Sequence, residues 1–197
     1  MDRRAGEAHR LAEAVALASS PPVPAAAAGL AVSWHLTWPS PAGLVWGLTA
    51  AVCAALGVLV VAYGVWHGWW ADIHLSRHSQ RPLPLACATV AAAVVWLACR
   101  EFGAPRELLA AAVMAPAGGA AVLVCTCFGK VSLHTSAASG SVTLVALLVD
   151  PWCAALFPLV AAVAWARLRT GAHTPGQAVA GALLGTGLTL GVVPPLL

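Results

Sequence analysis

The chain contains very few charged residues for its size. Asp, Glu, Lys and Arg make up 9% of its 197 residues, and the acidic residues number only seven. A soluble globular domain usually contains about 25% charged residues. Water could not solvate the surface of a packed chain with so little charge, so the composition excludes an ordinary soluble domain and favours lipid as the surrounding solvent.

Basic runs and cysteine motifs are also absent. The net charge of +3 is small and spread along the chain, without the basic stripe typical of nucleic-acid-binding proteins, so we expect no nucleic-acid partner. The six cysteines lie in apolar stretches and form no Cys-x-x-Cys pair. We interpret them as small hydrophobic side chains, and we expect neither a metal nor a cofactor.

The first 20 residues only partly match a signal peptide. Three arginines precede an apolar run at 14–18, but acidic residues interrupt the basic part and the run is five residues long. A cleaved signal needs about 7–15 apolar residues after a cationic start. We therefore expect residues 1–20 to form a cytosolic N-terminal tail with the pattern of a short amphipathic helix.

Apolar residues are abundant, at 60% of the chain. Charged and proline-rich breaks separate seven apolar segments, at about 21–35, 44–66, 83–99, 108–128, 135–149, 152–165 and 178–193. Several are shorter than the roughly 20 residues that cross a bilayer, so we expect polar residues at their ends to extend the helices. The sequence predicts an all-α membrane protein, a six- to seven-helix transmembrane bundle in residues 21–197.

Three polar clusters interrupt the apolar segments, at residues 72–82, 130–136 and 167–177. Polar side chains at membrane depth are costly and are functional hypotheses by default. Two segments separate the first cluster from the second, and two more separate the second from the third. The chain therefore crosses the membrane an even number of times between clusters, which predicts that all three lie on one face.

Each cluster combines a basic residue with histidine. Arginine recognises phosphate oxygens in a planar, bidentate arrangement, and histidine is a nucleophile or a general acid near neutral pH. Transfer of a phosphoryl group to one histidine, while a second protonates the leaving oxygen, needs this set of side chains. Arginine and lysine would stabilise the charge on the transferred group.

At these residues the sequence resembles the type 2 phosphatidic acid phosphatase superfamily, which includes the lipid phosphate phosphatases. The first family motif, Lys-x6-Arg-Pro, is matched by His74-x6-Arg81-Pro82, with histidine in place of lysine. The second, Pro-Ser-Gly-His, is matched by its serine and histidine, Ser132 and His134. The resemblance covers about residues 70–190.

The third family motif, Ser-Arg-x5-His-x3-Asp, is matched by Arg167-x5-His173-x3-Gln177, with glutamine in place of aspartate. This third motif and the cluster containing Asp72 and Arg77 also look like a bacterial branch of such proteins, in which the glutamine is native.

The resemblance implies the helical bundle of that superfamily and metal-independent hydrolysis of a lipid phosphate or diphosphate through a phosphohistidine. It implies that His173 is the nucleophile, His134 the general acid, and Gln177 the residue that orients the nucleophile. The expected phosphate-binding residues are Arg81, Arg167, Lys130, Ser132 and His74, with Asp72 and Arg77 as further candidates. Our hypothesis is that Lys130 supplies the charge lost where His74 replaces the family lysine.

Gln177 leaves alternatives open, because glutamine accepts a hydrogen bond but carries no charge. The comparable Asp→Asn change in a serine protease lowers the rate by about 10⁴. The chain is therefore a differently tuned phosphatase, a non-hydrolytic protein that binds or transports lipid phosphates, or an isoprenoid-diphosphate-processing enzyme on the same fold. Metal-dependent prenyltransferases need paired Asp-rich motifs, and Asp72 is the only acidic residue in the three clusters.

Basic residues outside the expected site predict which side of the membrane the site faces. Without Arg81, Lys130 and Arg167, the cluster face and the N-terminal tail keep five arginines, against two on the other face. The positive-inside rule then predicts a site on the cytoplasmic face of a multi-pass protein of the cell membrane. A lipid phosphate of the phosphatidate or polyprenyl type is the expected substrate.

Overall fold

The computed structural model describes residues 3–70 and 82–197, and within these ranges the chain is helical and contains no β-strand. Its α-helices are α1 (Arg3–Ala18), α2 (Pro22–Thr37), α3 (Ala42–Trp66), α4 (Pro82–Glu101), α5 (Arg106–Ala112), α6 (Met114–Phe128), α7 (Leu133–Leu148), α8 (Phe157–Arg169) and α9 (Pro175–Val192). Two short 3₁₀ helices, η2 (Pro151–Leu156) and η3 (Pro194–Leu196), follow α7 and α9.

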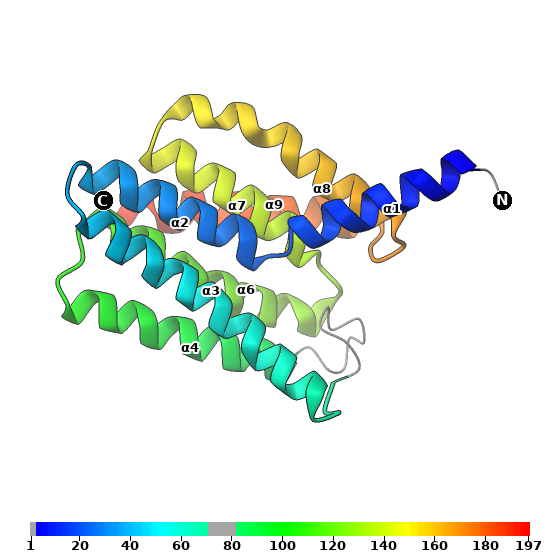
Figure 1. The fold of residues 1–197 in the computed structure, drawn as a ribbon, viewed down its shortest axis with the longest axis horizontal. Helices are drawn as coiled ribbons and strands as arrows, with labels where there is room; N and C mark the ends of the chain where they lie inside the picture. The colour runs from blue at the N-terminus through cyan, green and yellow to red at the C-terminus, as the bar shows by residue number, and fades with distance from the viewer. Residues whose placement is uncertain (1–2, 71–81) are drawn as a thin grey trace.

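The long helices lie alongside one another in a bundle, from which α1 extends at one end (Figure 1). The turns after α6 and after α8 lie at that same end, as do the end of α3 and the start of α4. We call this the motif end, formed by residues 66–70, 128–133 and 169–175. The turns after α2 and α7 and the C-terminus lie at the opposite end.

All seven predicted apolar segments are helical, five of them as single α-helices, and local sequence signals explain where several of these helices begin. Pro22 and Pro175 occupy the first turns of α2 and α9, where the missing N–H has no helical partner to lose. Ser132 and Thr174 are the N-cap residues of α7 and α9, and each side-chain oxygen accepts a backbone N–H of the first turn. As predicted, polar residues extend the helices: α8 continues to Arg169.

Two segments predicted as single helices are divided. The segment 108–128 forms α5 and α6, with a break at Val113, because Pro116 has no N–H for the carbonyl of Ala112 and its ring crowds that group. The segment 152–165 begins with the 3₁₀ turn η2, capped by Asp150, whose carboxylate accepts the N–H of Trp152 at 2.8 Å.

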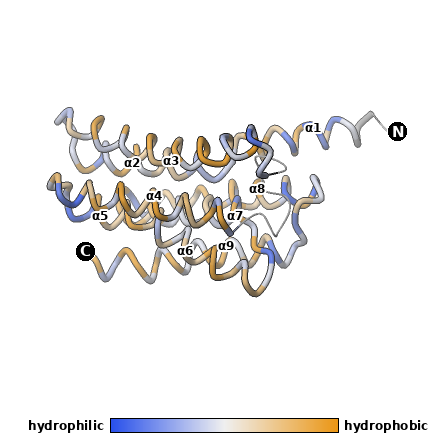
Figure 2. The backbone as a smooth tube through the Cα atoms, turned by 90° about the horizontal axis from the view of Figure 1, so that it is seen from below, coloured by the Kyte–Doolittle hydropathy of each residue, from blue (hydrophilic) through white to orange (hydrophobic). Residues whose placement is uncertain are grey.

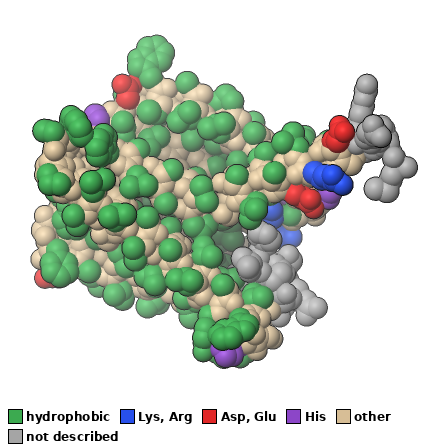
Figure 3. Space-filling model, in the orientation of Figure 1, with side chains coloured by type: hydrophobic (Ala, Val, Ile, Leu, Met, Phe, Trp, Pro, Cys, Tyr) green, Lys and Arg blue, Asp and Glu red, His purple; other side chains and the backbone are tan. Residues whose placement is uncertain are grey.

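The outer surface is suited to lipid. Hydrophobic side chains cover most of the face seen in Figure 3, and the hydrophilic segments lie near the two ends of the bundle in Figure 2. Among the described residues, five helical segments are long and apolar enough to cross a membrane: α3, α4, α5–α6, η2–α8 and α9–η3. The pair α1–α2, bent by 49°, would be a sixth. These helices indicate a membrane protein.

Helix α7 is the central element of the half of the bundle that carries the second and third clusters. It contacts α2, α8, α9 and η2, and nine of its 16 residues are buried. Three of the buried side chains, Thr135, Ser139 and Thr143, carry hydroxyl groups. A buried hydroxyl needs a hydrogen-bond partner, and these find theirs in the helix itself and in α9.

The contact between α7 and α9 combines these hydroxyl groups with glycine. Thr135 and Ser139 donate to the carbonyls of Ala178 and Ala182, each at 2.9 Å, so that equivalent bonds repeat one turn apart. A Cβ at Gly181 or Gly185 would collide with the backbone of α7, at the carbonyls of Ser132 and Ser136 respectively. Small residues thus let the two helices approach closely and fix the position of one helix N-terminus against the other.

Candidate functional site

The second and third polar clusters meet at the motif end. The backbone N–H of Ser132 donates to the carbonyl of Gln177 at 3.2 Å, and the ammonium group of Lys130 donates to the carbonyl of Ala172 at 2.8 Å. The structure therefore brings together residues 42 to 45 positions apart in the sequence, at one end of the bundle, which agrees with the prediction that these two clusters lie on the same side. The first-cluster candidates lie outside the described residues: Asp72, His74, Arg77 and Arg81.

The turn between α8 and α9 has a defined geometry. Gly171 has a φ of +68°, the N–H of Ala172 donates to the carbonyl of Arg167 at 3.1 Å, and that of Gly171 donates to the carbonyl of Leu168 at 3.0 Å. This pair of bonds is a Schellman motif, which favours glycine at the left-handed position. The N–H of His173 also donates to the carbonyl of Arg167, at 3.2 Å. The turn therefore fixes the backbone of His173 against the end of α8.

Gln177 links the start of α9 to the side chain of His173. Its Oε1 accepts the backbone N–H of Thr174 at 3.2 Å, while the Thr174 hydroxyl oxygen accepts the N–H of Gln177 at 3.4 Å. This reciprocal pair is a capping box. The same Oε1 lies 3.2 Å from Nδ1 of His173.

The capping box determines which nitrogen of His173 carries the proton. A backbone N–H can only donate, so the Gln177 group that faces Thr174 must be the carbonyl oxygen. An oxygen that only accepts requires a proton on Nδ1 of the facing imidazole. In the neutral ring, the lone pair is then on Nε2.

His134 lies in the first turn of α7 and is 6% exposed. The N-cap residue of that helix, Ser132, is completely buried, and its Oγ accepts the N–H of Thr135 at 3.5 Å. The N-termini of α7 and α9 both lie at the motif end. A helix N-terminus carries partial positive charge and favours an anion nearby, so both backbones support binding of a negatively charged group.

Positive side chains add to this field. Arg167 is 9% exposed near the end of α8, and Lys130 lies against the residue that precedes His173. The chain contains no Asp or Glu after Asp150, which lies at the opposite end next to η2. The described part of the site thus combines cationic groups and histidines, with no carboxylate from α8, α9 or the turn between them.

Metal ligands are not gathered in the described ranges, where no group of three or more His, Cys, Asp and Glu side chains could hold an ion. The side chains of the described residues can bind an anion, through Arg167 and Lys130, and can transfer a proton or attack as a nucleophile, through His134 and His173.

Sequence reasoning missed the residues that position the site. Thr174 forms the capping box, Gly171 permits the turn, and Thr135 fixes α7 against α9. Two of these leave sequence signals, because Thr-x-x-Gln is a capping-box pattern and a glycine just after a helix favours a C-terminal cap. The partner of Thr135 depends on helix packing and leaves no such signal. No protein family, curated protein or solved structure matches this chain.

Proposed function

We propose that this protein is an integral membrane phosphatase that hydrolyses a lipid phosphate or diphosphate through a phosphohistidine intermediate, on the pattern of the type 2 phosphatidic acid phosphatases. The observation that carries the proposal is the contact between Oε1 of Gln177 and Nδ1 of His173 at 3.2 Å. It orients the ring with the nucleophilic lone pair on Nε2. A glutamine can therefore perform the orienting part of the role that the resemblance gives to aspartate.

In the proposed first step, Nε2 of His173 attacks phosphorus, an N–P bond forms and the bond to the lipid oxygen breaks. His134, protonated, gives its proton to that oxygen, and the lipid leaves as an alcohol or a monophosphate. In the second step, His134 takes a proton from water and the oxygen of that water attacks phosphorus. The N–P bond breaks, inorganic phosphate leaves and His173 is regenerated. Arg167 and Lys130 stabilise the charge on the equatorial oxygens.

Ser132 has two assignments in this proposal. The resemblance gives it a hydrogen bond to phosphate, whereas its buried Oγ supports α7 by accepting the N–H of Thr135. We assign it primarily to capping the helix that carries His134. Arg81, His74, Asp72 and Arg77 remain predicted phosphate-site residues of the first cluster.

Phosphate release from purified, detergent-solubilised protein tests the proposal. The assay uses a panel of phosphatidate, phosphatidylglycerol phosphate and polyprenyl diphosphate, with and without EDTA. We expect release that persists in EDTA and is abolished by His173→Ala. His35→Ala is the matched control, because His35 is exposed at the opposite end of the bundle.

Each alternative has its own outcome. Release that requires Mg²⁺ would contradict the histidine mechanism. Saturable binding of a lipid phosphate without any release would identify a non-hydrolytic lipid-phosphate-binding protein. Conversion of a polyprenyl diphosphate without release of inorganic phosphate would indicate a different isoprenoid-processing reaction.

We also propose that the site faces the cytoplasm of a cell-membrane protein, because the sequence predicts five arginines outside the site on the cluster side and two on the other. This face favours isoprenoid diphosphates, which are made in the cytosol. A cysteine introduced at Ser79 should resist an impermeant thiol reagent in intact cells and react after permeabilisation. The protein with its six native cysteines is the background control. Reaction in intact cells would place the site outside.

A further inference from the structure

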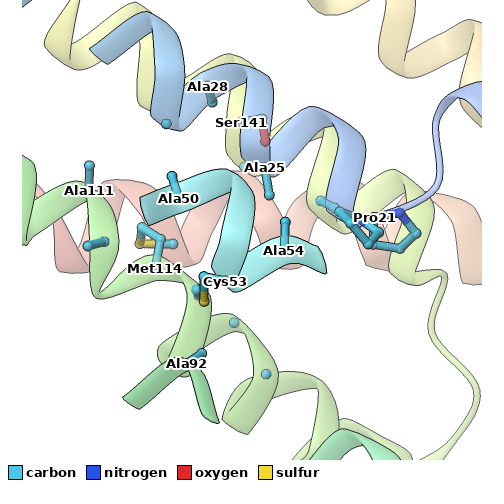
Figure 4. A pocket seen from close by; sticks show the side chains of 18 of the residues that line it. Pro21, Ala25, Ala28, Ala50, Cys53, Ala54, Ala92, Ala111, Met114 and Ser141 are labelled. Carbon is cyan, nitrogen blue, oxygen red and sulfur yellow. The ribbon is translucent and has the colours of Figure 1, made fainter. Parts of the chain in front are cut away.

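A cavity of about 340 Å³, partly open to the outside, is lined by α2, α3, α4, α5, α6, α7 and α9 (Figure 4). Its volume is in the range of small-molecule binding pockets, roughly 300–1,000 Å³. Alanines and glycines of neighbouring helices form much of the lining, and no charged residue takes part. The cavity is therefore suited to an apolar occupant.

The cavity extends along α7, and its lining includes Leu133 near the motif end but none of Lys130, His134, Arg167 and His173. Leu133 lines one end and Leu144 lies near the other, and a helix rises about 1.5 Å per residue, so the cavity extends about 16 Å along the bundle. Leu133 is between Ser132 and His134 in the sequence. An occupant whose polar end lay near His134 would thus have its apolar part directed towards the opposite end.

Two glycines maintain the width of the cavity. A Cβ at Gly118 would meet no atom within 4 Å, and a Cβ at Gly57 would meet only Ala88, at 4.0 Å. Both line the cavity. These positions therefore do not need glycine for close helix contact, in contrast to Gly181 and Gly185. The absence of side chains there leaves space that a larger residue would fill.

Six residues with hydroxyl side chains line the cavity: Ser33, Thr49, Thr89, Ser136, Ser141 and Thr189. Ser33 on α2 lines the cavity, is completely buried, and its hydroxyl oxygen has no hydrogen-bond partner among the described residues. A buried hydroxyl without a partner is unfavourable.

We propose that this cavity binds a hydrocarbon chain of the phosphate-bearing lipid, with the head group held at the motif end between Arg167, Lys130 and the two histidines. The inference rests on the proposed function for the identity of the head group. The apolar lining, which extends along α7 from Leu133, the residue before His134, carries the assignment of the chain. A straight isoprenoid chain and a fatty acyl chain share the chemistry that the lining requires.

Photo-crosslinking locates the chain without requiring catalysis. The probes are a farnesyl phosphate with a diazirine on its terminal isoprene unit and a lysophosphatidate with a diazirine at the end of its acyl chain. We expect labelled peptides from the far end of the cavity, around Cys99 and Ala111, and the stronger label identifies the preferred chain. Label confined to outward residues such as Leu183, which is 69% exposed, would overturn the inference.

Cavity-filling variants provide a second test. Gly118→Leu should reduce labelling and the kcat/KM for long-chain phosphates by about tenfold, the loss expected when roughly two methylene groups can no longer be buried. Hydrolysis of p-nitrophenyl phosphate, which has no chain, should not change. Gly187→Leu is the matched control, since a Cβ there also meets open space and Gly187 does not line the cavity.

Gly57→Leu is an independent variant in case Gly118→Leu does not fold. If either folded variant is labelled as strongly as the wild type, the inference is wrong. If the wild-type protein releases no phosphate but is labelled at the far end of the cavity, the proposed function fails and the chain site stands. If phosphate is released but the label lies elsewhere, the proposed function stands and the chain site is wrong.

Discussion

The carbonyl oxygen of Arg167 accepts the backbone N–H of His173 at 3.2 Å, so the proposed phosphate-binding arginine and the proposed nucleophile are joined through the main chain. The intervening turn depends on Gly171, whose φ is +68°. A distortion of the backbone in this turn would move the imidazole of His173 relative to the guanidinium group of Arg167 without changing either side chain.

Gly171→Ala should therefore lower both stability and activity. Alanine at a positive φ loses about 1 kcal/mol relative to glycine, and the strained turn would displace His173. Gly103→Ala is a matched control, because Gly103 has a φ of +74° in the equivalent turn after α4, with the N–H of Ala104 donating to the carbonyl of Cys99 at 3.0 Å. We expect similar losses in thermal stability for the two variants and loss of phosphate release only for Gly171→Ala. Equal activities would contradict the positional role of this turn.

Gln177→Leu should remove the oxygen that orients His173. The expected loss in kcat is up to about 10⁴, the effect of disturbing the equivalent tautomer in a serine protease, whereas Gln177→Glu keeps an accepting oxygen and should retain activity. Nitrogen NMR of labelled histidine measures the tautomer directly, and we expect the proton on Nδ1 only while the acceptor is present.

A control separates this effect from helix capping. Thr174→Ala removes the hydroxyl half of the capping box and keeps the Thr174 backbone N–H and the Gln177 side chain. It should cost about 1 kcal/mol of helix stability with little change in kcat. A rate for Gln177→Leu within about twofold of that of Thr174→Ala would remove the basis for the orienting role.

Gly181→Ala should destabilise the protein by about 1–3 kcal/mol, the usual range for overpacking. The added methyl group would collide with the carbonyl of Ser132 and the hydroxyl of Thr135, so α9 would have to move away from α7. Gly187→Ala, in the same helix, meets no atom within 4 Å and should be stabilising by up to about 1 kcal/mol through helix propensity. Unfolding in detergent measures both, and equal stabilities would contradict the close approach of the two helices.

Lys130→Met should weaken inhibition by orthovanadate, a phosphate analogue, by about 10- to 100-fold, the range for loss of a charged hydrogen bond. The ammonium group donates to the carbonyl of Ala172, the residue before His173, and we propose that it contacts the bound anion. Arg106→Met is the control, because Arg106 makes a similar contact with the carbonyl of Leu196, at 2.6 Å, at the opposite end. If Lys130→Met binds vanadate normally and His74→Ala does not, His74 fills the position of the family lysine.

The sequence was sufficient to predict the helices because the apolar segments are long and their breaks are marked by proline, glycine and charge. It also predicted that the clusters around His134 and His173 share one face, since parity depends only on the number of crossings. The division at Val113 was missed because the periodicity continues through it. Its cause, Pro116, lies three residues further on, and a proline within an apolar segment can bend a helix as well as interrupt it.

The geometry of the site could not be predicted from the sequence, for a different reason. Which residue of α9 meets Thr135, or which carbonyl Lys130 reaches, is decided by how two helices pack, and small residues are so frequent here that no spacing stands out. The cavity is likewise the space left between seven helices, so the sequence of no single segment predicts it.

Helix α7 has only 16 residues, a length of about 24 Å, while the hydrocarbon layer is about 30 Å thick. Since it is enclosed by other helices, it does not have to match the bilayer, and its N-terminus can stop short of the membrane surface. A phosphate held there would sit in a recess below the plane of the surrounding head groups. A lipid entering that recess would lose its contacts with neighbouring lipids and gain contacts with the protein before any bond is broken.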